Sequence, residues 1–514
     1  MLKTAMIFGN HMTLQRQKPI QVWGTAEPDA EVKVTLENIG CEANTIASES
    51  GEWMAELPSC EAAVGLKMVI SSGEETITYT DVRVGEVWIA GGQSNMEYFL
   101  MFDEQHETVL KDNREEIAFF DYPEVSYEEQ IEEKDYSRFG IWRTCDPENL
   151  PYYSAVGYYF AVQLQEKLQV PVGIVGCNWG GTPACTWMPK DALKGTKGEC
   201  WIQEYEDGIK ELNEELYQKA FRMNPENEHT EPFADNIQKQ MQNKMFYPGL
   251  SREEQVKLLE MMAQYQQGQA MPGIPAVGPW SEKRPGGLYE TMLTKVAPYT
   301  NRGVIFYQGE TDETHADAYE EVLTQLILSW RKLWGEELPF LMVQLAPFEE
   351  WLACSGTRFP ILRQAQEQVC KEMNQVYLCS SSDNGMQWDI HPKNKQPIGD
   401  RLALLAREHV YGETVLCDAP EAEKVQLEAD GLSITFLNST ELHIEGQAVN
   451  ALSVVDQNGE ILPIESVQIE GNKMLLRGKF EKGNVIHFAR TPYYEVNLYN
   501  EVGNPAKPFE VIIE

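Results

Sequence analysis

Alternation of apolar and polar residues marks both ends of the chain. Near the N-terminus, short runs with this pattern are separated by turn sequences and lie at 20–26, 32–37, 53–58, 66–72 and 76–82. Toward the C-terminus, the pattern returns at 432–437, 441–446, 474–478 and 484–490. Short strands at regular spacing are typical of antiparallel sandwiches and barrels. We therefore predict one β-rich module over residues 1–82 and a second over residues 416–514.

The middle of the chain has apolar runs that do not alternate. They lie at 87–92, 117–122, 172–178, 303–309, 340–346 and 376–382. Such runs fit strands buried on both faces of a parallel sheet. Helical patterns over 154–169 and 319–333 lie between the runs, and Gly335 is placed to end the second helix. Strands alternating with helices predict an α/β domain, a three-layer sandwich, over residues 83–415.

Residues 190–285 interrupt this alternation. Apolar residues at helical spacing run from Trp201 to Leu216, and a second helix is predicted to begin at Ser251, with Glu254 completing a capping box. The sequence GQAMPGIPAVGPW, rich in proline and glycine, follows. We expect a helical insertion between two strands of the sheet. A place beside the active site and a role as surface elaboration both stay open.

Charge and cysteine content narrow the classes of function. The 514 residues carry 42 Lys and Arg against 80 Asp and Glu, a net charge of −38. This excess repels phosphate backbones and anionic lipids, so neither nucleic acid nor membrane is expected as a partner. The chain contains no run of eighteen apolar residues and no secretion signal pattern. Because the ten cysteines are scattered without a Cys-x-x-Cys pair, we expect reduced thiols and a cytoplasmic protein.

Small and polar residues follow four of the predicted parallel strands. These segments are 91–97, 178–183, 308–312 and 383–392. Ligands bind beyond the carboxyl ends of the strands in open α/β sheets, so we expect the four segments to share one edge. This convergence is the main indication of a catalytic site.

Ser94 is the candidate nucleophile. It follows two glycines and Gln93 at a strand-to-helix transition, where little bulk surrounds the hydroxyl and backbone N–H groups can face an oxyanion. Taken alone, the segment is explained equally well by a serine that only caps a helix.

His391 is the candidate general base. It lies after the last predicted strand, between Asp389 and Pro392, and the helix that follows restrains its position. Asp389 is placed to orient the imidazole. The alternative is a helix entry with an incidental histidine. His315 is a rival base, but it lies in the polar start of a helix, where a solvated face is expected.

Two further segments offer donors for an oxyanion. Gly180 and Gly181 allow close backbone approach, so that an N–H can reach a ligand oxygen, and Gln308 offers a side-chain amide. The structural alternatives are a tight turn for the glycines and a buried amide bridging two loops for Gln308.

A metal or nucleotide site has little support in the sequence. The candidate ligands Asp312, His315, Asp383, Asp389 and His391 lack a recognised metal-ligand spacing. No phosphate-binding loop and no dinucleotide glycine motif occurs. We therefore predict neither a metal nor a cofactor.

Four motifs occur in a specific order, and they are GQSNM at 92–96, WGGT at 179–182, YQGE at 307–310 and DIHPKNKQ at 389–396. In this combination the chain resembles the sialate O-acetylesterase family of the SGNH-hydrolase superfamily, a branch that also contains acetylesterases of other sugars. The resemblance covers most of the chain, except the insertion. It implies a flavodoxin-like parallel sheet of the SGNH type, flanked by the two β-rich modules.

The resemblance also implies roles for individual residues. Ser94 would be the nucleophile, and its N–H, an N–H of Gly180 or Gly181, and the Gln308 amide would receive the oxyanion. In the wider superfamily an asparagine usually fills the place that Gln308 takes here.

The acid of the implied triad stays open. In the superfamily it usually lies three residues before the histidine, whereas Asp389 lies two residues before His391. Asp389 is the first choice, Asp383 the second, and a Ser–His dyad oriented by a backbone carbonyl the third.

The implied activity is carbohydrate O-acetylesterase, through an acyl-serine and without metal or cofactor. Sialic acid and acetylated xylo- or manno-oligosaccharides are the candidate substrates, with Arg143 and Arg363 as candidate carboxylate anchors. A non-catalytic carbohydrate-binding protein, using the β-rich modules and the 12 tryptophans, is the alternative from a different class. A homo-oligomer is compatible with the sequence.

Overall fold

In the computed structural model the chain divides into two compact units. The first unit comprises Met1–Thr311 and Glu321–Phe340, and the second comprises Asp312–Glu320 and Leu341–Glu514. The structure describes all residues except 134–135, 137, 224–242, 268–276 and 352–353. Within the described residues, no helix is both long enough and apolar enough to cross a bilayer.

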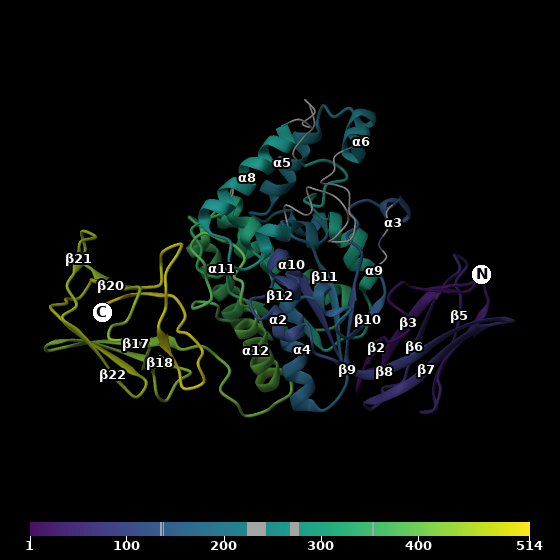
Figure 1. Ribbon diagram of the computed structural model, residues 1–514, viewed down its shortest axis with the longest axis horizontal. Coiled ribbons are helices and arrows are strands. Elements are labelled where there is room, and N and C mark those ends of the chain that lie inside the picture. The colour runs from purple at the N-terminus through teal and green to yellow at the C-terminus, as the bar shows by residue number, and fades with distance from the viewer. Residues whose placement is uncertain (134–135, 137, 224–242, 268–276, 352–353) are drawn as a thin grey trace. The chain divides into compact units, whose positions relative to one another are not determined.

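Short strands form the N-terminal part of the first unit, drawn in purple in Figure 1. One sheet has the order β1-β3-β6, and the remaining antiparallel strands pair in the order β5-β4-β7-β8. The strand bounds are β1 Lys3–Thr4, β2 Thr13–Gln15, β3 Ile20–Thr25, β4 Glu31–Leu36, β5 Cys41–Ile46, β6 Glu52–Leu57, β7 Ala63–Ser72 and β8 Glu75–Gly92. In β6, Trp53, Ala55 and Leu57 are buried and the residues between them are exposed, as expected for a strand with one face in a core.

β8 is longer than the sequence pattern predicts, because the runs 76–82 and 87–92 form one continuous strand. Its first part pairs antiparallel with β7, and its last part pairs parallel with strands of a second, buried region of the sheet. From Val82 onward every residue of β8 is buried. The predicted boundary between residues 82 and 83 falls inside this strand, and the three-domain division stays a prediction.

Two cysteine side chains meet in the N-terminal part. Cys41 begins β5, and Cys60 lies in the connection between β6 and β7. Their Sγ atoms are 3.0 Å apart, and both thiols also lie within hydrogen-bonding distance of the Pro58 carbonyl. The contact therefore links the start of β5 to the connection that leads from β6 to β7.

The buried sheet of the first unit has the order β10-β9-β11-β8-β12. Its further strands are β9 Arg114–Asp121, β10 Trp142–Cys145, β11 Val172–Asn178 and β12 Gly303–Tyr307. β9, β11, β8 and β12 are parallel, as their unbroken apolar sequences predict, and only β10 is antiparallel. Gly92 pairs with both Asn178 and Tyr307, so β8, β11 and β12 end at the same edge. The predicted convergence of their polar segments is present within this unit.

Helices pack against these strands, and the predicted end of the second helix at Gly335 is confirmed. In α4 (Ala155–Leu168), the Ser154 hydroxyl accepts a hydrogen bond from the Gly157 N–H at 3.0 Å, and Gln169 ends the helix in a left-handed conformation. α10 (Tyr319–Trp334) ends before Gly335, whose φ is +68°. The Trp330 indole on α10 donates to the Trp187 carbonyl at 2.8 Å.

The insertion contains helices α5 (Glu199–Ile209), α6 (Glu214–Met223) and α8 (Arg252–Gln267). The single helix expected from Trp201 to Leu216 is wrong, because Asn213 starts a new helix by accepting the Leu216 N–H at 3.0 Å. The capping box before α8 is confirmed, since Ser251 and Glu254 exchange hydrogen bonds of 2.9 and 3.3 Å. Most of the segment GQAMPGIPAVGPW lies outside the described residues.

The second unit also combines strands with helices. β13 (Phe340–Val343), which belongs to this unit from Leu341 onward, and β16 (Val376–Cys379) are neighbours in the sheet. α11 (Phe359–Glu372) and α12 (Gln396–Leu405) follow a strand each. A two-stranded hairpin, β14 (Glu350–Trp351) with β15 (Cys354–Ser355), precedes α11.

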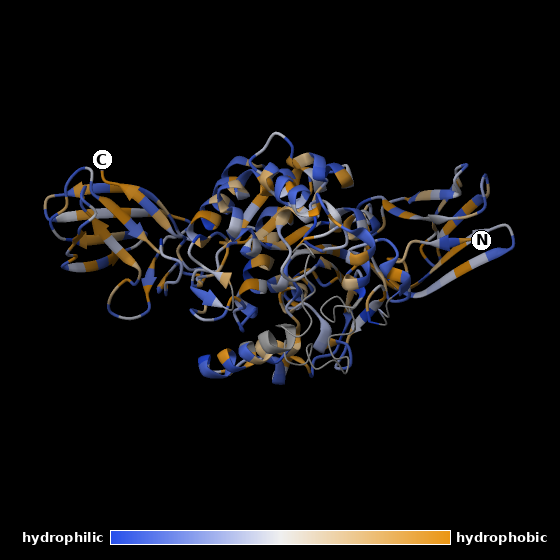
Figure 2. Ribbon diagram, turned by 90° about the horizontal axis from the view of Figure 1, so that it is seen from above, coloured by the Kyte–Doolittle hydropathy of each residue, from blue (hydrophilic) through white to orange (hydrophobic). Residues whose placement is uncertain are grey.

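The C-terminal part of the second unit consists of antiparallel sheets. Two four-stranded sheets have the orders β17-β18-β23-β22 and β21-β20-β24-β26. The strand bounds are β17 Glu421–Glu428, β18 Gly431–Leu437, β20 Leu452–Val455, β21 Ile461–Leu462, β22 Ser466–Glu470, β23 Lys473–Arg477, β24 Val485–Phe488 and β26 Phe509–Ile512. Ile434, Met474, Val454 and Ile486 from both sheets share one core. Figure 2 shows hydrophobic and hydrophilic residues interspersed along these strands. Mixed sheets with helices confirm the α/β character of the chain.

Candidate active site

Ser94 is the first residue of a short helix, α1 (Ser94–Glu97), directly after β8. The preceding turn needs glycine, because Gly92 has a φ of +137° and a Cβ there would lie 2.1 Å from the Tyr307 carbonyl oxygen. Gln93 takes the N-cap position, so the interpretation of Ser94 as a mere helix cap is wrong. The Ser94 side chain is half-buried at the sheet edge.

The loop after β12 is tied to this turn. Gln93 Oε1 accepts from the N–H groups of Gly309 and Thr311 at 3.4 and 3.3 Å, and the Asn95 amide donates to Glu310 at 2.6 Å. The GQSNM and YQGE motifs therefore hold each other in place.

Gln308 lies in the same network. Its Nε2 donates to Gln93 Oε1 and to the Thr182 carbonyl, both at 3.3 Å. These are long hydrogen bonds from a buried amide that bridges two loops, which is the structural alternative raised for this residue. Its role as an oxyanion donor stays a prediction.

Gly180 lies against Ser94. A Cβ added to Gly180 would be 3.2 Å from the Ser94 Cβ and 3.1 Å from Glu97 Oε2. The Gly180 N–H donates to Glu97 Oε2 at 2.7 Å. This contact differs from the predicted oxyanion role, because an N–H that donates to a carboxylate does not donate to an oxyanion at the same time. Gly181, with a φ of +74°, is the other predicted donor of this turn.

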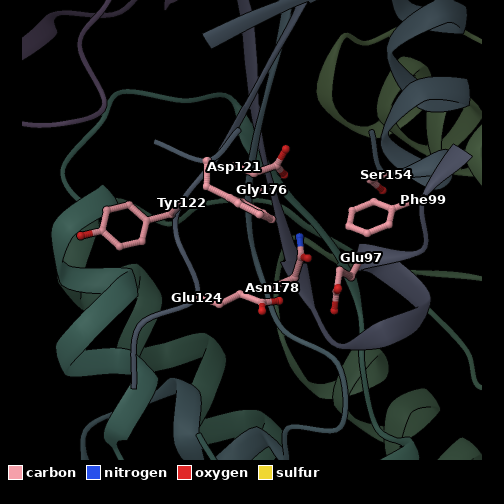
Figure 3. A pocket seen from close by; sticks show the side chains of 9 residues that line it. Glu97, Phe99, Asp121, Tyr122, Glu124, Ser154, Gly176 and Asn178 are labelled. Atoms are coloured by element: carbon pink, nitrogen blue, oxygen red, sulfur yellow. The ribbon is translucent and has the colours of Figure 1, made fainter. Parts of the chain in front are cut away.

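Glu97 and Asn178 line a pocket next to this turn, together with Asp121, Glu124 and Ser154 (Figure 3). Arg143 forms an ion pair with Asp121 and is buried. Burial raises the pKa of Asp121, although the Arg143 charge opposes this shift. The prediction of Arg143 as a substrate anchor is therefore wrong, because Arg143 forms a buried structural ion pair instead.

His391 is held in the second unit by Asp389. The His391 backbone N–H donates to Asp389 Oδ1 at 2.8 Å, and His391 Nδ1 lies 3.5 Å from the same oxygen. The second carboxylate oxygen of Asp389 lies 2.8 Å from Lys393 Nζ. Asp389 and His391 are both buried, at 1% and 3% exposure. A carboxylate bridges the imidazole and an ammonium group.

Burial and positive charge set the protonation of this group. Burial lowers the pKa of His391 to about 4. The positive charges of Lys393 and Lys395 also lower this pKa, whereas Asp389 opposes the shift. Burial also opposes the charge of Asp389, but the His391 hydrogen bond and Lys393 outweigh it, so the pKa of Asp389 is lowered. At neutral pH the imidazole is neutral, which is the state that a general base requires.

The alternative acid and the second anchor have other partners. Arg401 holds both oxygens of Asp383 at 2.7 Å, so Asp389 rather than Asp383 is the carboxylate beside His391. Arg363 is 2% exposed and donates to the carbonyls of Leu345 and Pro492, so it is a structural residue and not a substrate anchor.

His315, the rival base, is half-buried, and its Nδ1 lies 3.0 Å from the Thr314 hydroxyl. Ser94 and His391 belong to different units of the chain, and their pairing stays a prediction.

Comparisons with known proteins find similarity to one family of enzymes. The profile of the family described as carbohydrate esterase, sialic acid-specific acetylesterase, matches residues 269–405. The sialate O-acetylesterase of Rattus norvegicus is 25% identical over 86% of this chain and 80% of its own length. The human enzyme of the same name is 24% identical over 99% of this chain and 92% of its own length. A crystal structure of a carbohydrate acetylesterase from Xanthomonas citri covers 99% of both chains at 26% identity, with a TM-score of 0.74.

The resemblance to the sialate O-acetylesterase family is confirmed. The segment matched by the sialate O-acetylesterase profile contains the YQGE and DIHPKNKQ motifs, and thus Gln308, Asp389 and His391. The human sialate O-acetylesterase aligns over almost the whole chain, with the insertion included in the aligned span.

Sequence reasoning missed four residues of this site. Glu97 directly follows the GQSNM motif, and Lys393 lies four residues after Asp389, so spacing could have indicated both. Trp351 packs edge-on against the His391 ring at 4.8 Å, and Trp388 lies three residues before His391. The contact of Trp351 arises from the β14–β15 hairpin, which no local pattern in the sequence predicts.

Proposed function

We propose that this protein is a serine-type carbohydrate O-acetylesterase with Ser94 as nucleophile and His391 as general base. The observation that carries the proposal is the buried Asp389–His391 pair, whose imidazole is neutral at neutral pH. Three observations favour a catalytic over a structural role for His391: the adjacent Asp389 carboxylate, the packing of Trp351 against its ring, and the similarity of the chain to esterases. The activity itself, ester hydrolysis of acetylated carbohydrate, follows from the relatives.

In the proposed mechanism His391 takes the proton of the Ser94 hydroxyl as its oxygen attacks the acetyl carbonyl. Asp389 stabilises the imidazolium that forms and fixes its orientation. The imidazolium returns the proton to the departing sugar oxygen, which leaves an acetyl-serine. Water, deprotonated by His391, then attacks this ester, and acetate leaves as Ser94 recovers its proton.

Oxyanion stabilisation is assigned to the Ser94 N–H, an N–H of the Gly180–Gly181 turn, and the Gln308 amide. Gly181 is favoured over Gly180, because the Gly180 N–H donates to Glu97. The Gln308 amide donates hydrogen bonds of 3.3 Å to Gln93 and Thr182, which are long and therefore weak. Loss of one such donor typically lowers turnover by about 10²–10³-fold.

We also propose that the strands and helices form the three-layer SGNH arrangement, with β-rich modules before and after it. The parallel order β9-β11-β8-β12 and the shared strand edge in the first unit support this proposal. A cytoplasmic location is proposed from the scattered cysteines alone.

Sialic acid is the substrate named for the mammalian relatives, and it is proposed here beside acetylated xylo- or manno-oligosaccharides. Acetate release should be measured from 9-O-acetyl-N-acetylneuraminic acid, acetylated xylobiose and acetylated mannobiose. The sugar with the highest kcat/KM identifies the substrate class. We expect acetyl esters to be preferred over butyryl esters, because a sugar acetylesterase needs only a shallow acyl site.

Hydrolysis of 4-nitrophenyl acetate tests the proposed mechanism. Ser94→Ala and His391→Ala are each expected to lower kcat by roughly 10³-fold or more with unchanged circular dichroism. Thr314→Ala, beside the rival His315, is the matched control and should keep full activity. Undiminished turnover in Ser94→Ala would remove the nucleophile assignment, and absence of hydrolysis in the wild type would favour a carbohydrate-binding protein.

A further inference from the structure

Trp388 is the most exposed aromatic side chain among those that the structure describes. Its exposed fraction is 39%, whereas every other described aromatic side chain is half-buried or buried. Indole rings contribute large apolar areas, and they are normally buried in cores or interfaces. An indole kept at the surface, three residues before a buried histidine, is therefore a feature that folding alone does not explain.

The segment that carries Trp388 is held at both ends. On one side, the Gln387 carbonyl accepts from the N–H groups of Glu349 and Glu350, both at 3.2 Å. On the other side, Asp389 accepts the His391 N–H at 2.8 Å. The backbone on both sides of Trp388 is thus held by hydrogen bonds before any ligand binds.

Trp351 approaches the same histidine from the hairpin that Gln387 holds. Its ring stands perpendicular to the His391 ring, at 86°, with the centroids 4.8 Å apart. Edge-to-face contact is a favourable geometry for aromatic pairs. The His391 ring therefore packs against the Trp351 indole, and the exposed indole of Trp388 lies three residues before this histidine in the chain.

We propose that Trp388 is a sugar-binding platform, on which the pyranose ring of an acetylated carbohydrate stacks while its ester reaches His391. A pyranose ring has an apolar C–H face and a polar rim, and the flat indole complements the apolar face without charge. Trp351 is a positioning residue that holds the His391 ring. This inference rests on the proposed function and names the leaving-group side of that site.

The test compares a sugar ester with an ester that lacks the sugar. Trp388→Ala is expected to raise KM for acetylated xylobiose or 9-O-acetyl-N-acetylneuraminic acid about tenfold, while kcat/KM for 4-nitrophenyl acetate stays within twofold. Trp388→Phe, which keeps a smaller aromatic face, should recover part of the loss. Leu427→Ala on β17 is the matched control, because the Leu427 side chain has a similar exposed fraction of 40%. It should leave KM and kcat unchanged for both substrates.

Trp351→Ala should act differently, because it touches His391 itself. It is expected to lower kcat for both substrates and to shift the acid limb of the pH profile, whereas Trp351→Phe should restore both. A structural role alone would lower the melting temperature without moving the pH profile.

Sugar binding separates this inference from the proposed reaction. In a Ser94→Ala background, the same two acetylated sugars should change the tryptophan fluorescence, and Trp388→Ala should abolish the change. Unaltered sugar affinity in Trp388→Ala, or equal losses on sugar and nitrophenyl esters, overturns the platform. Failure of Ser94→Ala to lower turnover overturns the proposed function and leaves the binding result to be judged by itself.

Discussion

The burial of His391 has a direct consequence for catalysis. A general base works only when it is unprotonated, and burial places the pKa of this imidazole at about 4 rather than near the usual 6.5. The rate should therefore stay at its plateau down to weakly acid pH.

We predict that kcat/KM for 4-nitrophenyl acetate falls only below about pH 5, as His391 takes up a proton. The measurement is a pH profile from 3.5 to 8 with the protein checked for unfolding at each pH. An acid limb centred near 6.5 would show a solvated histidine and contradict the buried geometry.

Asp389 is the side chain whose replacement should separate a triad from a dyad. Asp389→Asn keeps the shape but removes the charge that balances Lys393 and stabilises the imidazolium. We expect kcat to fall by roughly 10²–10⁴-fold, less than for His391→Ala if a backbone carbonyl also orients the ring.

Asp383→Asn serves as the control for this prediction. It removes the partner of Arg401 and should lower stability while leaving the pH profile of activity unchanged. Equal losses in Asp389→Asn and His391→Ala would indicate a strict triad, and loss confined to Asp383→Asn would reverse the choice of acid.

Residue identity was predictable where chemistry and spacing coincide, as for Asp389 two residues before His391. Lys393 was not predicted, because a lysine in a sequence reads as a solvated charge unless burial is known, and here it is 8% exposed. Arg143 and Arg363 failed as predicted anchors for the same reason, since long-range partners decide whether an arginine faces solvent.

At the scale of elements, the turn after β11 is built to touch α1. Gly180 approaches the Ser94 side chain so closely that a methyl group would sit 3.2 Å from its Cβ. The turn and the nucleophile cannot both keep their positions if a side chain is added.

We predict that Gly180→Ala lowers kcat by roughly ten- to a hundredfold, because small displacements of a nucleophile are costly. Gly9→Ala, at a glycine with nothing within 4 Å of the added methyl, should have no effect. Steady-state kinetics with 4-nitrophenyl acetate and a thermal melt separate misplacement from unfolding. Full activity in Gly180→Ala would show that the turn yields freely.

Element boundaries were the weaker part of the sequence prediction. The buried strands were predicted because their apolar runs do not alternate. β8 was predicted as two strands, because its start has a polar, alternating pattern and its end is continuously apolar. The break between α5 and α6 was not predicted, because the apolar residues keep their helical spacing across it. Only the cap hydrogen bond of Asn213 marks the start of the new helix.

On the scale of the whole molecule, the buried ionisable groups link stability to pH. The unfolded chain protonates His391 near pH 6.5 and the folded chain only near 4. The stability that the neutral imidazole contributes is therefore present above pH 6.5 and is lost as the pH falls toward 4. The pKa of Asp389 is lowered from its usual 3.8, so the stability that its carboxylate contributes is lost at still lower pH, below that value.

We predict that the wild type loses about 3 kcal/mol of stability between pH 7 and pH 4 through His391. Urea unfolding at several pH values measures the slope. His391→Gln should flatten that slope, and an equally steep slope in the variant would place the acid sensitivity elsewhere in this strongly acidic chain.

The neighbouring thiols of Cys41 and Cys60 in the N-terminal part make the protein responsive to the redox state of its surroundings. Sulfur atoms 3.0 Å apart need little movement to bond once a small-molecule disulfide accepts their electrons and protons. The oxidation state of this pair then reports the redox conditions to which the protein has been exposed. Mass spectrometry would detect the disulfide as a mass lower by two hydrogens and as two linked peptides after digestion. If the protein is isolated from its own cells in the presence of an alkylating agent, the state of this pair is preserved. That state then indicates whether the enzyme works in a reducing or an oxidising compartment.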